Sequence, residues 1–277
     1  MINGITIGAD PELFIVDNNN KVISAVGLIP GEKGKPYVAD NMPKGFGIEI
    51  DNILGEFNIP PVTSKRGFVT NINYMKNYID DFVKQINPNY GIQCIASRIV
   101  DDDQLQSDEA KLFGCMPDYN VYTEKKNKKP NAKNQNLRSA GFHIHIGYDH
   151  PAVPESLRMV KLLDIFLGIP SVIIDPDKKR RELYGKAGAF RLTKYGVEYR
   201  TLSSYMMSKD SILYLVWDLL SLAANFCGSP NAFDKNQIQY IINESDVEEA
   251  KKFLNNFEYI KESHLERVQN FLKTFKV

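Results

Sequence analysis

Two strand-like segments carry acidic residues two positions apart. Asp10 and Glu12 in GADPELFIV, and Glu49 and Asp51 in FGIEID, alternate with apolar residues. Because residues i and i+2 of a β-strand lie on one face, each acidic pair is expected to project from a single face. Carboxylates gathered at this density repel one another unless cations lie close by, and Mg²⁺ and Mn²⁺ take such oxygen ligands. The spacing therefore indicates a site for divalent metal ions.

The same alternation recurs in three further segments. They contain Glu56 and Asn58 in GEFNIP, His143 and His145 in FHIHIG, and Glu198 and Arg200 in VEYR. One alternative is an antiparallel sheet whose polar face simply meets water. A solvent face normally mixes in Lys, Thr, Ser and Gln, whereas these positions are almost all metal-ligating or phosphate-binding types. A second alternative is zinc, since two histidines at this spacing hold zinc as readily as magnesium.

A basic, glycine-containing stretch follows, with the sequence RRELYGKAGAFRLTKYGVEYR. Its glycines let backbone N–H groups approach a ligand, and planar guanidinium groups suit phosphate oxygens. It lacks the spacing of a P-loop, and a solvated basic loop is the alternative interpretation. An acidic metal-binding face beside this stretch favours phosphoryl transfer from a metal–nucleotide complex. The nucleotide-binding candidates here are Arg181, Lys186, Arg191 and Arg200.

Strands and helices are interleaved along the chain, which predicts an α+β fold. Residues 1–277 are expected to form a single domain, with a C-terminal helical part from about 209 to 277. The polar segment Thr123–Asn136 is expected to be a solvated loop or a lid. The expected strands are Ile5–Val16, Phe46–Asp51, Leu54–Ile59, Ile92–Arg98, Gly141–Tyr148 and Val197–Ser203. The expected helices are an amphipathic one over Phe68–Ile86, then Glu155–Leu167, Ser211–Phe226, Asp246–Asn255 and Ser263–Lys273.

Composition narrows the class of protein. The 277 residues include 34 Lys+Arg and 34 Asp+Glu, and this balance argues against a nucleic-acid partner. No segment has the length and apolarity of a membrane span or the pattern of a signal peptide. The three cysteines are scattered and show no CxxC spacing, which favours a reducing compartment. We therefore expect a cytoplasmic protein.

Six motifs in order resemble a known family. They are GADPE, GEFNIPP, FGCMPDYN, AGFHIHIGY, RRELYGKAGAFR and GVEYRTLSS. Together they resemble the phage-type COOH–NH2 ligases, a divergent branch of the glutamine synthetase/glutamate–cysteine ligase superfamily. The resemblance extends from about Ile5 to about Tyr205. It implies a curved, mainly antiparallel sheet that forms a funnel backed by helices, with ATP at one mouth, the acceptor substrate at the other and Mg²⁺ or Mn²⁺ between them.

The resemblance also implies roles for individual residues. His145 would face phosphate, while Arg191 and Arg200 would contact ATP phosphates and the transferring phosphoryl group. Together with Glu198, these two arginines would be the catalytic residues. The first strand carries Asp-Pro-Glu where better-known relatives have Glu-x-Glu, so the shorter Asp10 has less reach. The implied metal ligands are Asp10, Glu12, Glu49, Asp51, Glu56, His143 and Glu198.

The implied reaction is ATP-dependent amide or peptide bond formation through an acyl phosphate. Its substrates would be a small-molecule or peptide carboxylate and an amine, and the apolar C-terminal helices allow a homo-oligomer. Three alternatives stay open at this stage. They are a phosphotransferase on the same fold, a zinc hydrolase built on the HxH motif, and a binding protein without catalysis.

Overall fold

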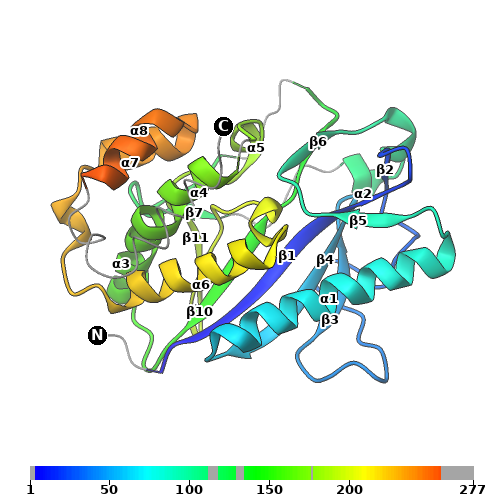
Figure 1. Cartoon of the computed structure of the whole chain (residues 1–277), viewed down its shortest axis with the longest axis horizontal. Helices are drawn as coiled ribbons and strands as arrows, with labels where there is room; N and C mark the ends of the chain where they lie inside the picture. Colours follow the sequence, from blue (N-terminus) through cyan, green and yellow to red (C-terminus); the bar gives the residue numbers. More distant parts are fainter. Residues whose placement is uncertain (1–3, 112–117, 129–133, 176, 257–277) are drawn as a thin grey trace.

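A long strand, β1 (Thr6–Val16), forms the middle of the sheet in the computed structural model (Figure 1). The structure describes residues 4–111, 118–128, 134–175 and 177–256. Strand β1 pairs antiparallel with β4 (Leu54–Val62) on one side and with β10 (Phe142–Gly147) on the other. Strands that are far apart in sequence therefore become neighbours at the position where their polar residues alternate.

The remaining strands extend this sheet in both directions. Its main path has the order β3-β4-β1-β10-β12-β11-β7-β8. The bounds are Gly47–Asp51 for β3, Gly196–Tyr199 for β12, Ala189–Thr193 for β11, Tyr119–Asn120 for β7 and Lys125–Lys126 for β8. Strands β2 (Val22–Ile23) and β5 (Gly91–Gln93) pair with the end of β1, whereas β6 (Ser97–Ile99) and β9 (Leu137–Ser139) form a separate pair.

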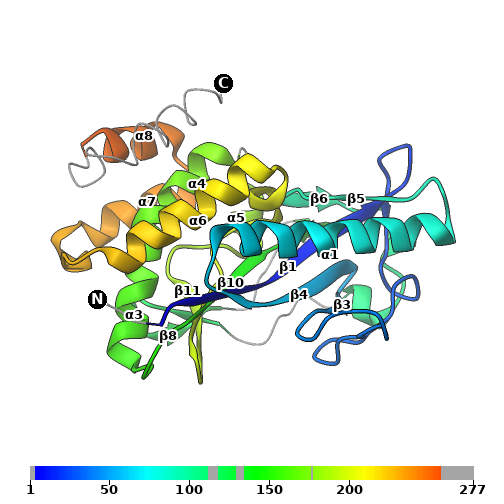
Figure 2. The ribbon, with the colours of Figure 1, turned by 60° about the horizontal axis from the view of Figure 1, so that its bottom comes forward.

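The long helices pack on one face of the sheet (Figure 2). Helix α1 (Lys65–Ile86) is capped by the preceding residue, Ser64, whose hydroxyl accepts a hydrogen bond from the Gly67 N–H group. Its apolar stripe faces the sheet, and the ring of Phe68 stacks on Phe142 of β10 at 6.3 Å between centroids. Helices α3 (Val153–Leu163) and α6 (Asp210–Asn225) continue this layer.

A π-helical turn, Asp164–Gly168, continues α3 into α4 (Ile169–Ile174). The shorter helices are α2 (Asp108–Lys111), α5 (Arg180–Leu183), α7 (Lys235–Glu244) and α8 (Val247–Asn255), with 3-10 turns at Asp102–Gln104, Ser204–Met207 and Pro230–Ala232. No helix in the described part of the chain combines the length and apolarity needed to cross a bilayer; α1 is long enough but mostly polar.

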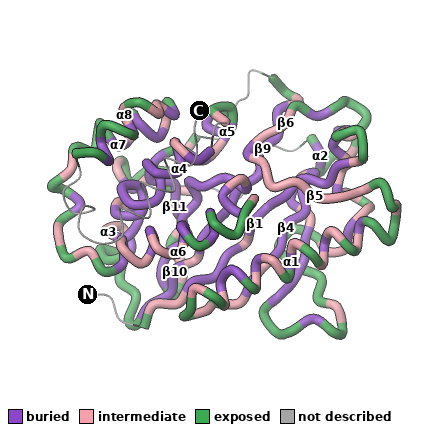
Figure 3. The backbone as a smooth tube through the Cα atoms, viewed as in Figure 1, coloured by how far each residue is buried: buried purple, intermediate pink, exposed green. Residues whose placement is uncertain are grey.

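Burial follows the alternation along the strands. Leu13, Phe142, Ile144 and Tyr199 are completely buried beneath the helices, and the centre of the sheet is buried along its length (Figure 3). Their neighbours at i±1 project from the opposite face of the sheet, and many of these are also shielded from solvent. The helix layer therefore supplies the apolar core, and the opposite face is left for polar side chains.

The α+β class and the mainly antiparallel sheet predicted from sequence are confirmed. Several predictions of individual elements were wrong. Ala189–Thr193 is a strand where a loop was expected, Lys235–Glu244 is a helix that was not expected, and the predicted strand Ile92–Arg98 is interrupted between β5 and β6. The predicted helix Ser263–Lys273, and residues 129–133 of the expected lid segment, lie outside the described residues.

Candidate active site

The register of the sheet aligns the polar residues that alternate in sequence. Directly paired residues of antiparallel strands project from the same face. We use the term acidic face for the sheet face that carries these residues. The pairs on this face are Asp10 with His143, Glu12 with Glu56, Glu56 with Glu49, His145 with Glu198, and Glu198 with Arg191.

Asp10, His143 and Glu198 form the first group of potential metal ligands. One ligand atom from each lies within 4.8 Å of the others. The His143 Nδ1 atom is 3.6 Å from Asp10 Oδ1 and 3.9 Å from Glu198 Oε1. His143 and Glu198 are 5% and 4% exposed, so bulk water solvates neither the imidazole of His143 nor the carboxylate of Glu198.

Glu12, Asp51 and Glu56 form the second group, again with ligand atoms within 4.8 Å of one another. The Gly141 N–H group donates a hydrogen bond of 2.6 Å to Glu12 Oε2. Glu56 is only 6% exposed, and in the described part of the chain no donor contacts its carboxyl group. Burial raises the pKa of Glu56 well above its usual value, and the charges of Asp10 and Glu12 raise it further.

Glu49 lies at the outer edge of the second group, on β3. Its Oε2 atom accepts a hydrogen bond of 2.9 Å from the Gly34 N–H group. Burial raises the pKa of this carboxyl group; the Gly34 hydrogen bond opposes the shift, and nearby Asp51 and Asp10 add to it. Four carboxylates therefore share the Glu56 end of the acidic face, and cations would stabilise them there.

Two arginines, Arg200 and Arg191, lie against the first group of potential ligands. Arg200 is 4% exposed; its guanidinium forms a close ion pair with Glu198 and lies 3.4 Å from His143 Nδ1. Arg191 lies 3.4 Å from Glu198 Oε1. Asp118, which sequence reasoning did not single out, lies 3.8 Å from Arg200 Nε. Both arginines thus stand beside the first group of ligands.

Two other predicted phosphate-binding residues lie elsewhere. Arg181 is buried, donates a hydrogen bond of 3.1 Å to the Gly185 carbonyl oxygen, and interacts electrostatically with Asp175 and Asp164 on the helix side. Lys186 is exposed, and its backbone carbonyl oxygen accepts hydrogen bonds from the Thr201 hydroxyl and the Ala189 N–H group. Among the described residues, neither side chain therefore contacts the acidic face. A stretch rich in basic residues does not reveal on which side of the sheet each residue lies.

The neighbouring Arg180 is the arginine that sequence reasoning missed. It is 2% exposed, and its guanidinium donates to the Leu202 carbonyl oxygen at 2.9 Å. Burial lowers the pKa of Arg180, and the charge of Glu12 is the largest effect opposing that shift. Arg180 therefore lies close to both Glu12 and Gly141, whose contact it can stabilise.

His145 pairs with Asp10 at the other end of the acidic face. Its Nε2 atom lies 2.8 Å from Asp10 Oδ1, and its Nδ1 atom contacts the Tyr195 hydroxyl. Burial by itself lowers the pKa of His145, but the charge of Asp10, the hydrogen bond to Asp10 and the charge of Glu198 together outweigh it, and the net shift is upward. Burial likewise raises the pKa of Asp10, and the attraction of His145 and His143 overcomes it and lowers that pKa.

A hollow of about 360 Å³ opens beside His145. Apolar or small residues, among them Gly8, Ile59 and Pro61, form most of its lining, and Tyr195 closes one side. The Asn58 Oδ1 atom is buried at this hollow without a hydrogen-bond partner in the described part of the chain. It could accept a hydrogen bond from a ligand.

The donor atoms of the acidic face suit Mg²⁺ or Mn²⁺. Each group offers mainly carboxylate oxygens, with one imidazole in the first, and such oxygen-rich sets favour these ions over zinc. Two ligands on opposite sides of such an ion are about 4.2 Å apart, which the observed spacing of at most 4.8 Å approaches. Glu56, which is buried and has no donor in the described part of the chain, is a second observation that favours a cation at this position.

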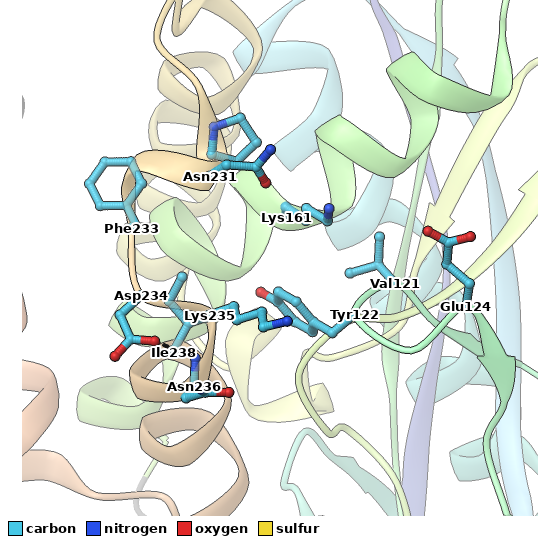
Figure 4. A pocket seen from close by; sticks show the side chains of 11 residues that line it. Val121, Tyr122, Glu124, Lys161, Asn231, Phe233, Asp234, Lys235, Asn236 and Ile238 are labelled. Carbon is cyan, nitrogen blue, oxygen red and sulfur yellow. Dashed lines mark hydrogen bonds between the residues drawn. The ribbon is translucent and has the colours of Figure 1, made fainter.

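On the helix side of the sheet, Tyr199, the residue after Glu198, belongs to a hydrogen-bond network centred on Asp164. Asp164 is completely buried and accepts hydrogen bonds from the Tyr199 hydroxyl at 2.8 Å and the Tyr122 hydroxyl at 2.9 Å. Tyr122 also lines a separate hollow of about 430 Å³, together with Lys161 of α3 and Lys235 of α7 (Figure 4). None of the described residues around this second hollow belongs to the acidic face.

Asp164→Asn is expected to change how stability depends on pH. Burial raises the pKa of Asp164 from 3.8 to about 7, so the folded protein holds a proton that the unfolded chain releases within this pH window. Wild-type stability should therefore fall as pH rises through the window, by on the order of 2–4 kcal/mol. Urea unfolding at pH 5 and pH 8 measures this, and the variant should lose less stability between them. Equal losses in both proteins would contradict the assignment.

Gly141→Ala is expected to disturb both metal-ligand groups at once. A Cβ atom at this position would lie 2.5 Å from His143 Nε2 and 3.2 Å from an Arg180 nitrogen. The imidazole must move, and Mn²⁺ affinity should drop roughly 10- to 100-fold. Calorimetric titration measures this. Gly8→Ala is the matched control, because its Cβ meets no atom closer than 3.4 Å; an equal loss in both variants would refute the explanation.

Comparison with known protein families matches residues 132–272 to the family described as phage phiEco32-like COOH.NH2 ligase-type 2. The match includes β10, β11 and β12 and covers half of the chain. The chain belongs to this COOH–NH2 ligase family. As a family member it is an enzyme of the carboxylate–amine ligase kind, which forms C–N bonds. A comparison with curated proteins gave no match.

The matched region differs from the stretch between Ile5 and Tyr205 whose motifs resemble the family. It begins after the strands that carry Asp10, Glu12 and Glu56, and it continues past Tyr205 through the C-terminal helices. The resemblance predicted from the motifs ends near Tyr205, whereas the family match extends to residue 272. The pairing of β1 with β10 and the contacts of Asp10 with His143 and Glu198 join the N-terminal strands to the matched region.

Proposed function

We propose that this ligase joins a carboxylate to an amine at the expense of ATP, through an acyl-phosphate intermediate. The observation that supports it best is the convergence of two cation-binding groups and two arginines on one sheet face. A reaction that transfers a phosphoryl group needs such an arrangement, because charge on the phosphate oxygens must be neutralised while donor and acceptor are aligned.

The proposed reaction has two steps. In the first, a carboxylate oxygen of one substrate forms a bond to the γ-phosphorus of ATP, and the bond to the bridging oxygen breaks to release ADP. In the second, the nitrogen of a neutral amine bonds to the activated carbonyl carbon and inorganic phosphate leaves with the proton lost by nitrogen. The recessed position of Glu12, His143 and Glu198 helps to exclude water, which would hydrolyse the intermediate.

Arg200 and Arg191 are positioned to stabilise the transferring group. Both guanidinium groups already contact Glu198, so their orientation is fixed before substrate binds. Asp10, His143 and Glu198 would hold one divalent ion, and Glu12, Asp51 and Glu56 another. When bound, such ions neutralise phosphate charge and polarise the phosphoryl oxygens.

The hollow beside His145 is proposed to hold the base of the nucleotide. Its lining by Ile59, Pro61 and the Tyr195 ring suits a flat apolar ring system, and the unpartnered Asn58 oxygen can accept a hydrogen bond from an exocyclic amino group. Its lining residue His145 contacts Asp10 of the first ligand group, so a nucleotide bound here would direct its phosphates towards Arg191 and Arg200. The Glu49–Glu56 end is then left for the second substrate.

Hydroxylamine trapping tests this proposal. The protein is incubated with ATP, Mg²⁺, hydroxylamine and pools of amino acids or short peptides. A carboxylate substrate should give a hydroxamate, with ADP and phosphate in equal amounts. A stable phosphorylated product in the phosphorus NMR spectrum would indicate a phosphotransferase instead. Hydrolysis that needs zinc and no nucleotide would overturn the proposal in favour of a hydrolase.

A further inference from the structure

A lysine from a surface turn reaches the second group of metal ligands. The Lys33 Nζ atom lies 2.5 Å from Asp51 Oδ1. The lysine side chain is 42% exposed and the aspartate side chain 12%, so the pair spans from solvent to the recess. An alkylammonium group thus supplies positive charge to an aspartate that also belongs to the Glu12–Asp51–Glu56 group.

The turn that carries Lys33 is held against β3. Glu32 and Lys35 exchange backbone hydrogen bonds of 2.8 and 3.2 Å, which closes the turn. Gly34, at its tip, has a φ of 77°, a conformation that glycine adopts without strain. Its N–H group donates to Glu49. The turn therefore has two attachments to the acidic face, one through an ammonium group and one through a backbone amide.

We propose that Lys33 is an internal competitor for the second cation site, and that a divalent ion bound at Glu12, Asp51 and Glu56 releases the turn from β3. The inference rests on the proposed function, since it assumes that these three residues bind metal. An ammonium group and a divalent ion placed on the same carboxylate repel each other, so the two occupants exclude one another. Release of the turn would uncover the Glu49–Glu56 end of the acidic face. Metal binding would then precede entry of the second substrate.

Calorimetric titration with Mn²⁺ tests the competition. Lys33→Met keeps the aliphatic stem and removes the charge, and it should bind the ion roughly 3- to 10-fold more tightly than wild type. Lys35→Met is the matched control, because Lys35 lies on the same turn and, in the described part of the chain, its ammonium group pairs with the exposed Glu32 and not with the acidic face. Its affinity should equal that of wild type.

Hydrogen exchange supplies a second readout that does not depend on activity. In wild type, Mn²⁺ should speed amide exchange in residues 31–36, because the Gly34 bond to Glu49 is lost. In Glu56→Gln the same addition should leave exchange unchanged. Equal or weaker Mn²⁺ binding by Lys33→Met, with binding otherwise intact, would refute this inference alone. If neither wild type nor Lys33→Met binds Mn²⁺, the proposed function fails as well.

Discussion

Glu198→Gln is expected to lower ATP-dependent ADP release by about 10³-fold or more. Glu198 belongs to the first ligand group, forms a close ion pair with Arg200 and lies 3.4 Å from Arg191. The amide keeps the shape of the side chain but removes its charge, so both arginines lose the anion that orients them. Coupled-enzyme detection of ADP under saturating Mg²⁺ measures the effect.

A matched change elsewhere separates this effect from loss of a negative charge in general. Glu182→Gln lies on α5, where the side chain is exposed, and it should retain wild-type activity. Circular dichroism should show both variants folded. Near-normal ADP release by folded Glu198→Gln would contradict the role assigned to this strand.

Glu56→Gln is expected to make the protein more stable and less active at the same time. Its carboxyl group is buried, lacks a donor in the described part of the chain and is repelled by Asp10 and Glu12. Removing this repulsion should raise the free energy of unfolding by about 1–2 kcal/mol in metal-free buffer at pH 8. Loss of a ligand from the second group should reduce ADP release by about 10²- to 10³-fold.

The pH dependence gives the sign of the Glu56 effect. Because the folded state raises the pKa of this carboxyl group, the folded protein holds a proton that the unfolded chain releases, and wild-type stability falls as pH rises through that interval. The glutamine variant lacks this slope, so its advantage should grow from pH 5 to pH 8. Urea unfolding with EDTA measures it, and a variant less stable than wild type at pH 8 would show that Glu56 is an ordinary structural carboxylate.

Sequence alternation was enough to predict which side chains share a face. The i, i+2 spacing of Asp10 with Glu12 and of His143 with His145 requires this in any strand. It could not specify that β1 lies between β4 and β10, which is what places Asp10 opposite His143 and Glu12 opposite Glu56. Pairing between distant strands depends on tertiary packing, and that information is spread over the whole chain.

The basic stretch shows where local reasoning fails. Arg191 lies on β11 directly opposite Glu198, and Arg200 follows the last residue of β12, two positions after Glu198, so the pairing of β11 with β12 brings both arginines to Glu198. Arg181 lies on the four-residue helix α5, where no period-two rule applies, and it packs on the helix side. The contact between Lys33 and Asp51 joins a turn to a strand 18 residues away. No sequence pattern in either segment predicts this contact.

Anomalous diffraction from crystals soaked with Mn²⁺ and a non-hydrolysable ATP analogue tests the central claim most directly. The predicted result is two manganese peaks on the acidic face, one among Asp10, His143 and Glu198 and one among Glu12, Asp51 and Glu56. The triphosphate should approach Arg191 and Arg200. Manganese bound only at the protein surface, or a triphosphate located away from both groups, would contradict the account.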